Sequence, residues 1–149
     1  MGNGFQLHSP VFYAALFEKL GAASILDLDP CLGSKAVGSA ILGIQYYTLH
    51  DQRFEDGLVA GLGAFVGLKH QWHAGEQVDF VISDLDLRPT RFHIAQVAVA
   101  LQAAKFAKHV AVFVPSWYRL VVEQQYPPES VLPIMTGKSN REPDYFFIY

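Results

Sequence analysis

The sequence contains a single cysteine, Cys31, and few charged residues. One cysteine cannot form an intrachain disulfide, which excludes a small disulfide-stapled fold and favours a reducing, cytoplasmic location. Charged residues make up only 17% of the 149 residues, whereas apolar residues make up 51%. This balance predicts a sizeable buried core, with apolar surface left over for self-association or a protein partner.

Long hydrophobic runs and an excess of positive charge are also missing. Gly, Lys or His interrupts each apolar stretch before the ~20 residues that cross a bilayer. Residues 1–9 lack a basic start followed by an apolar run, so neither a membrane span nor a secretory leader is expected. The 11 basic and 14 acidic residues give a formal charge of -3, which excludes a broad cationic surface for nonspecific nucleic-acid binding. No repeat or linker divides the chain, and we expect residues 1–149 to form one domain.

Helix-like and strand-like segments alternate along the chain. Ser9 is the expected N-cap of the first helix, Pro10 its first residue and Gly21 its end, while Gly43 ends the second helix. The predicted helices are 10–20, 34–42, 54–66, 117–124 and a long one from a Thr90 cap to about Lys108. The predicted strands are 24–28, 45–49, 68–73, 78–84 and 110–114, followed by a terminal hairpin of 131–136 and 145–149. This alternation predicts an α/β fold with a parallel sheet.

Residues 25–35 are the most informative segment. An apolar run there ends in carboxylates. The chain then turns through Pro30 and Gly33 and begins a helix. Ligands of open α/β sheets bind beyond the carboxyl ends of parallel strands, where a helix N-terminus offers free N–H groups and an acid accepts hydrogen bonds from ribose. The segment therefore predicts a nucleotide-type ligand site, with an ordinary strand-to-helix turn as the alternative.

The order of the elements resembles the class I S-adenosylmethionine-dependent methyltransferase fold over nearly the whole chain. Within that class, three segments are similar to DNA amino-methyltransferases. They are Leu28-Asp29-Pro30-Cys31-Leu32-Gly33-Ser34 for the first motif, Leu42-Gly43-Ile44-Gln45-Tyr46-Tyr47 for the run into the second strand, and Ser9-Pro10-Val11-Phe12-Tyr13 for the segment before the first motif. The resemblance implies a doubly wound, Rossmann-like, mostly parallel sheet with an antiparallel C-terminal hairpin strand, and S-adenosylmethionine as the cofactor.

The resemblance also implies roles for the matched residues. Those expected to line the cofactor are Asp29, Cys31, Gly33 and Ser34, and those expected to close over it are Ser9, Pro10 and Phe12. His50 and Asp51 follow the second strand, where the family carries the acid that binds the ribose. Asp84, at the carboxyl end of the strand at 78–84, is the expected catalytic residue, accepting a hydrogen bond from the methyl acceptor. That acceptor is expected to be a nucleic acid or a small molecule.

Three positions depart from the family pattern. His50 stands where the family's second strand ends in an acid, and Asp51 comes one place later. Lys35 stands where the first motif carries glycine, and we expect its side chain to extend into solvent. The run Asp84-Leu85-Asp86-Leu87 lacks the Pro-Pro-aromatic sequence whose ring stacks on a flipped base. These departures leave a second function open, namely an inactive methyltransferase-like module that binds a nucleotide-type ligand or a protein partner.

Two further pairs of residues are weaker candidates. His70 and His73 have a spacing that suits two metal ligands on a helix, but no third ligand is near in sequence, so no metal site is expected. Trp117 and Tyr118 follow a predicted strand and would suit a stacking platform, but we expect these aromatic rings to be buried.

Overall fold

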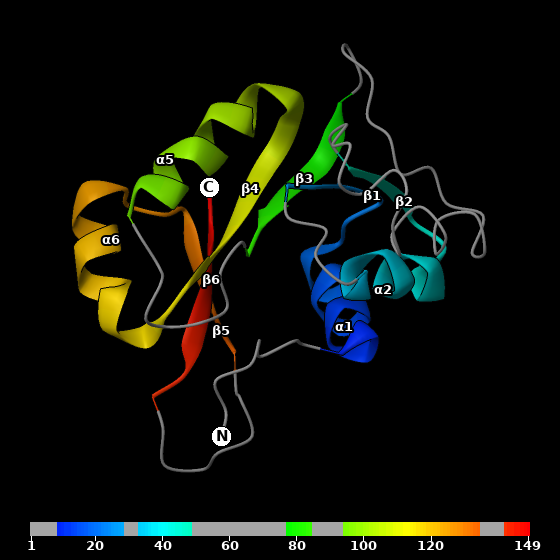
Figure 1. Cartoon of the computed structure of the whole chain (residues 1–149), viewed down its shortest axis with the longest axis horizontal. Helices are drawn as coiled ribbons and strands as arrows, with labels where there is room; N and C mark the ends of the chain where they lie inside the picture. The colour runs from blue at the N-terminus through cyan, green and yellow to red at the C-terminus, as the bar shows by residue number, and fades with distance from the viewer. Residues whose placement is uncertain (1–8, 29–32, 49–76, 85–93, 135–141) are drawn as a thin grey trace.

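The computed structural model describes residues 9–28, 33–48, 77–84, 94–134 and 142–149. Within these ranges six strands form one sheet in the order β2-β1-β3-β4-β6-β5 (Figure 1). The strands are β1 (Ser24–Asp27), β2 (Gln45–Thr48), β3 (Val78–Ser83), β4 (Ala107–Val114), β5 (Ser130–Ile134) and β6 (Asp144–Ile148). β2, β1, β3 and β4 are parallel, whereas β6 is antiparallel to both β4 and β5. The predicted α/β fold with its antiparallel C-terminal strand is confirmed.

Local chemistry sets the ends of the first helices. The helices are α1 (Pro10–Leu20), α2 (Ser34–Leu42), α5 (Ala95–Gln102) and α6 (Arg119–Gln125). Ser9 Oγ accepts a hydrogen bond from Phe12 N at 3.1 Å, which caps α1. Gly21 and Gly43 end α1 and α2 in the left-handed conformation, at φ 67° and 71°. Both helices agree with their predicted bounds, and no helix in the described ranges is long and apolar enough to cross a membrane.

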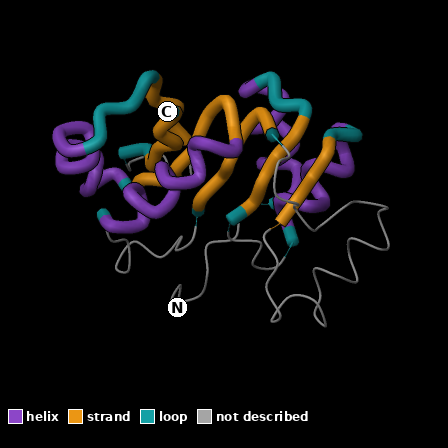
Figure 2. The backbone as a smooth tube through the Cα atoms, turned by 90° about the horizontal axis from the view of Figure 1, so that it is seen from above, coloured by secondary structure: helices purple, strands orange, loops and turns teal. Residues whose placement is uncertain are grey.

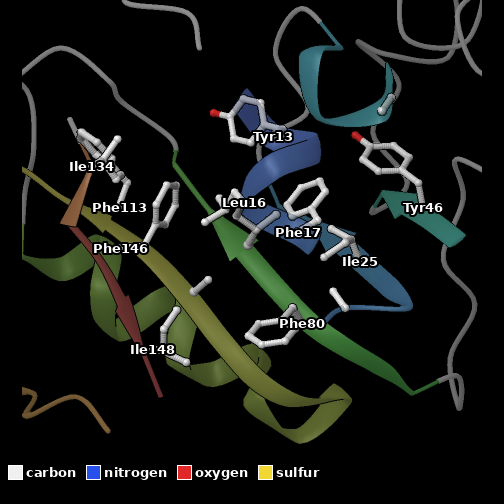
Figure 3. Packing of buried hydrophobic residues seen from close by; sticks show 14 residues of the cluster. Tyr13, Leu16, Phe17, Ile25, Tyr46, Phe80, Phe113, Ile134, Phe146 and Ile148 are labelled. Atoms are coloured by element: carbon white, nitrogen blue, oxygen red, sulfur yellow. The ribbon is translucent and has the colours of Figure 1, made fainter. Parts of the chain in front are cut away.

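The helices cover opposite faces of the sheet (Figures 1 and 2). Side chains alternate between the two faces along a strand. In β1, Ile25 packs with α1 side chains such as Phe17, in the group of buried residues shown in Figure 3. Its neighbour Leu26 packs on the other face with Val97 of α5 and Val122 of α6. The sheet is therefore buried between two helical layers, as its apolar strands require.

The prediction of a helix that continues to Lys108 is wrong. α5 ends at Gln102, a 3₁₀ turn η2 (Ala103–Phe106) follows, and β4 begins at Ala107. Ala107 pairs with Val78 and His109 with Phe80, so these residues join the sheet as partners of β3. Pairing with β3 outweighs the helical preference of this alanine- and lysine-rich segment. The predicted helix at 54–66, the predicted strand at 68–73 and Thr90 lie outside the described residues.

Gly38 allows α1 and α2 to pack closely. A Cβ atom at this position would lie 2.9 Å from the Pro10 carbonyl oxygen, 2.9 Å from Tyr13 Cβ and 3.0 Å from Ala14 N. These atoms cannot rotate away, so the helices would have to separate. We expect Gly38→Ala to lower the free energy of unfolding by about 1–2 kcal/mol in urea titrations, although alanine is the better helix former.

The matched control on α2 is the exposed Ile41. Replacing Ile41 with alanine is expected to change the free energy of unfolding by no more than about 0.5 kcal/mol. Equal stability of Gly38→Ala and the wild-type protein would contradict the close packing of the two helices.

Candidate functional site

The strand order places the topological switch point of the sheet at the carboxyl ends of β1 and β3. The chain passes from β1 to β2 on one side, whereas β3 lies on the other side of β1, so the connections diverge at this point. Open α/β sheets bind their ligands at such a switch point. Asp27 is the last residue of β1, and Asp84 directly follows β3. Leu28 N donates a hydrogen bond to the Ile82 carbonyl at 3.1 Å, which holds the two strand ends together.

Strand alternation directs both carboxylates to the face that α1 and α2 cover. Ile25 of β1 and Ile82 of β3 are buried on that face. Asp27 and Asp84 each come two residues later and so share this side of the sheet. Their exposed fractions are 0% and 7%. Two acidic side chains are thus withdrawn from water at one point, which is costly unless each is paired.

Lys35 supplies the pairing cation. It lies in the first turn of α2, after Gly33 has turned the chain at φ 87°. Its Nζ lies 3.0 Å from Asp27 Oδ1 and also forms an ion pair with Asp84 Oδ1. Only 3% of Lys35 is exposed. The expectation that its side chain extends into solvent is therefore wrong, because two buried carboxylates draw the ammonium group inward.

Two tyrosines complete the hydrogen bonding. The Tyr13 hydroxyl of α1 donates to Asp84 Oδ2, and the Tyr46 hydroxyl of β2 donates to Asp27 Oδ2 at 2.7 Å. Figure 3 shows both tyrosines on this side of the sheet, among the buried side chains. We call the five residues Tyr13, Asp27, Lys35, Tyr46 and Asp84 the Lys35 cluster. Every carboxylate oxygen in it has a donor, so the buried charges are held in a fixed arrangement.

The charges in the Lys35 cluster are unequal, with two carboxylates and one ammonium group. Burial raises the pKa of Asp27 above its ordinary value, the charge of Lys35 opposes this rise, and the charge of Asp84 adds to it. The Tyr46 hydrogen bond favours the ionised form of Asp27. The full removal of Asp27 from water is thus the largest influence on its protonation.

The raised pKa of Asp27 predicts the sign of a pH effect on stability. A carboxyl group whose pKa is raised by folding contributes stability below its unfolded-state pKa, and this contribution is lost as pH rises through the folded-state pKa. We therefore expect Asp27→Asn to gain stability relative to the wild-type protein as pH rises from about 4 to 8. Urea unfolding across this range measures the difference, and a constant or shrinking difference would contradict the assignment.

Asp79, at the other end of β3, provides a control of opposite sign. Its pKa is lowered, first by the hydrogen bond from Ala23 N at 2.8 Å and also by Lys108. A carboxyl group whose pKa is lowered by folding contributes stability at pH values above its unfolded-state pKa. This contribution is lost as pH falls through the folded-state pKa. The same titrations on Asp79→Asn are expected to show the wild-type advantage shrinking as pH falls below about 4.

The described residues that the sequence assigned to the cofactor lie on α1 and α2. Ser9 and Pro10 start α1, and Phe12 packs its ring edge-on to Tyr13, with centroids 5.2 Å apart. Gly33 and Ser34 start α2. The hydrogen bond from Tyr13 to Asp84 brings the start of α1 to the end of β3. The structure therefore gathers the predicted catalytic residue and the start of both helices near one end of the sheet.

Other predicted residues are not described or lie elsewhere. Those outside the described ranges are Asp29, Cys31, His50, Asp51, His70, His73 and Asp86. Trp117 is 55% exposed, so the expectation of burial is wrong for it. In the part of the chain that the structure describes, no group of three or more His, Cys, Asp or Glu side chains is placed to hold a metal ion.

Sequence reasoning missed four residues of this site. They are Tyr13, Asp27, Lys35 and Tyr46. One signal was available, because Asp27 interrupts an otherwise apolar run that forms a buried strand, and a charge at such a position requires a partner. The partner itself could not be read from the sequence.

Comparison with known proteins shows the class of fold. No protein-family model matches the sequence, and no curated protein is similar to it. Solved structures do share its fold. A Pyrococcus horikoshii protein designated an RNA methyltransferase aligns over 98% of this chain and 91% of its own, with 18% identity and a TM-score of 0.63.

Two more of the matching structures contain S-adenosyl-L-methionine or SAH. Fibrillarin from Aeropyrum pernix, with natively bound S-adenosyl-L-methionine, aligns over 95% of this chain and 74% of its own, at 13% identity and a TM-score of 0.57. An O-methyltransferase from Bacillus cereus, in complex with SAH, aligns over 93% of this chain and 79% of its own, at 15% identity and a TM-score of 0.60. The chain thus has the Rossmann-like fold of class I methyltransferases.

Proposed function

We propose that this protein is an S-adenosylmethionine-dependent methyltransferase. The observation that carries the proposal is the position of the Lys35 cluster, with two acidic side chains at the switch point of the sheet beside the first turn of α2. The shared fold of the methyltransferase structures supports it, two of which hold S-adenosylmethionine or SAH. A fold alone hosts many functions, so the residues at the site decide between them.

The described residues fit such a cofactor. Gly33 turns the chain into α2 with a positive φ and carries no side chain that a ligand beside its backbone would meet. The N–H groups of the first turn of α2 suit a carboxylate. Asp27, Asp84 and Lys35 together carry one net negative charge when all are ionised, which favours a nearby sulfonium. Asp29, Cys31, His50 and Asp51 remain proposed contacts to the rest of the cofactor.

The chemistry requires alignment more than acid or base strength. When bound, the cofactor supplies an activated methyl group for in-line displacement. Asp84 follows the strand that borders the switch point, where its carboxylate is proposed to accept a hydrogen bond from the N–H or O–H group of the acceptor. Tyr13 and Lys35 hold this carboxylate by its two oxygens and so fix its orientation. Their role in this reaction is positioning.

RNA is the acceptor that we propose first. The Pyrococcus horikoshii protein is designated an RNA methyltransferase, and it matches this chain over nearly its full length. The formal charge of -3 gives no broad cationic surface, so a nucleic acid would bind through local contacts. Small molecules are the competing acceptors, and the match to a Bacillus cereus O-methyltransferase supports an oxygen atom as the site of methylation.

A second function is a binding module without catalysis. The observation that favours it is the engagement of both Asp84 oxygens in a side chain that is only 7% exposed. An acceptor would have to approach a carboxylate that two protein groups already hold. Such a module would bind the cofactor or a related nucleotide and transfer no methyl group.

Two assays distinguish these functions. Calorimetry with S-adenosylmethionine and SAH tests binding. If neither compound gives a heat of binding at millimolar concentration, the protein is neither a methyltransferase that uses this cofactor nor a module that binds it. Methyl-labelled cofactor is then supplied with pools of RNA, DNA, protein and small molecules. The methyltransferase predicts label in one pool, whereas tight binding with no transfer to any pool would support the binding module.

A further inference from the structure

The ammonium group of Lys35 lies in surroundings that have the composition of a cation-binding site. Asp27 of β1 and Asp84 of β3 contact it from two strands, and the ring of Tyr13 on α1 has its centroid 5.7 Å from Nζ. Carboxylates and an aromatic face are the groups that hold organic cations in proteins. We propose that these groups form a binding site for a singly charged ammonium or sulfonium group, and that Lys35 fills this site from within the chain.

The site is held in place by contacts that do not involve Lys35. Tyr46 donates to the Asp27 oxygen that does not contact Lys35, and Tyr13 donates likewise to the second oxygen of Asp84. Asp27 and Asp84 also follow paired strands, whose ends the hydrogen bond from Leu28 to Ile82 joins. The carboxylates are thus positioned by the sheet and the tyrosines, so their arrangement is expected to persist when the lysine side chain is removed.

The charge of the site explains its preference for a cation. Removing Lys35 takes away the ammonium group that contacts both buried carboxylates, and their burial then opposes ionisation more strongly. A cation that enters the vacated space relieves this cost, whereas a neutral molecule of the same shape does not. An organic cation suits the space better than a hydrated divalent metal, because Mg²⁺ and Ca²⁺ require six or more oxygen ligands.

This inference is independent of the proposed methyltransferase activity, since it concerns groups within the protein alone.

Chemical rescue tests the proposal. Lys35→Ala removes the atoms that n-propylammonium contains, so this amine is the probe. At about five times its Kd, it is expected to raise the midpoint of thermal unfolding of Lys35→Ala by roughly 2–4 °C. The neutral isostere n-propanol is expected to give no such rise. The wild-type protein, whose site is filled, and Lys35→Met, whose side chain fills the same space without charge, are expected not to respond to the amine.

The outcome remains decisive if Lys35→Ala does not fold by itself. The same titration then measures recovery of the folded circular dichroism signal, which the amine is expected to restore and n-propanol is not. Equal effects of amine and alcohol, or an equal response of the wild-type protein, would overturn the proposal. No cofactor or methyl acceptor is present in this assay, so failure here and failure of the methyl-transfer assay are separate results.

Discussion

Replacing Lys35 with methionine is expected to lower the free energy of unfolding by about 3–5 kcal/mol at neutral pH. Methionine matches the length and apolar body of lysine, so packing changes little. The loss arises because the variant lacks the ammonium group that contacts both buried carboxylates, Asp27 and Asp84. Urea denaturation followed by circular dichroism measures it, and the pKa of Asp27 is expected to rise further in the variant.

Two controls separate charge from packing. Lys19 lies on α1 and is exposed, so Lys19→Met is expected to change stability by no more than about 0.5 kcal/mol. Combining Lys35→Met with Asp27→Asn and Asp84→Asn removes the two carboxylate charges that Lys35 contacts, and is expected to recover part of the lost stability. A Lys35→Met protein as stable as the Lys19→Met protein would contradict the buried ion pairs.

Asp84→Asn has the second large expected effect, on methyl transfer. Asparagine keeps the shape of aspartate but removes the charge and one acceptor oxygen, so the methyl acceptor loses its alignment. Turnover is expected to fall by about 100-fold or more. The Kd for S-adenosylmethionine is expected to stay within about threefold, since the proposed contact of Asp84 is with the acceptor. Single-turnover transfer and calorimetry give the two values.

The carboxylate at the opposite end of β3 supplies the matched control. Asp79→Asn is expected to leave turnover within about twofold of the wild-type value. Asp79 contacts Ala23 and Lys108 at the start of β3, at the opposite end of the strand from Asp84. Equal losses of cofactor binding and turnover in Asp84→Asn would place this residue on the cofactor side of the site. Unchanged turnover would remove Asp84 from the reaction.

Much of the N-terminal half of the fold is predictable because its determinants are local. Ser9 and Pro10 start α1, and Gly21 and Gly43 end α1 and α2, through interactions within a few residues of each position. The buried strand at Val78–Ser83 is also recognisable from its apolar run alone. These signals depend little on the rest of the structure, so the predicted bounds agree with the observed ones.

The Lys35 cluster was not predictable because its contacts are not local. Lys35 and Asp84 are separated by 49 residues, and Tyr13 and Asp84 by 71. A lysine in the first turn of a helix is ordinarily solvated, and only the convergence of two strand ends makes its burial favourable. The end of α5 was predicted wrongly for the same reason, because Ala107 joins the sheet by pairing with Val78 of β3.

Several expectations stay predictions. A cytoplasmic location and the specific likeness to DNA amino-methyltransferases are among them. Self-association is another, and it is consistent with three exposed apolar residues in or just before α6, Trp117, Leu120 and Val121. Sedimentation at micromolar concentration measures the oligomeric state directly.

Mapping of ligand contacts by NMR tests the central claim most directly. In a titration of ¹⁵N-labelled protein with SAH, backbone amide shifts are expected at the end of β1, in the first turn of α2 and around Asp84. The amides of β5, at the far edge of the sheet, are expected to stay unchanged. Shifts confined to β5 and β6, or none at millimolar SAH, would contradict a cofactor site at the carboxyl ends of β1 and β3.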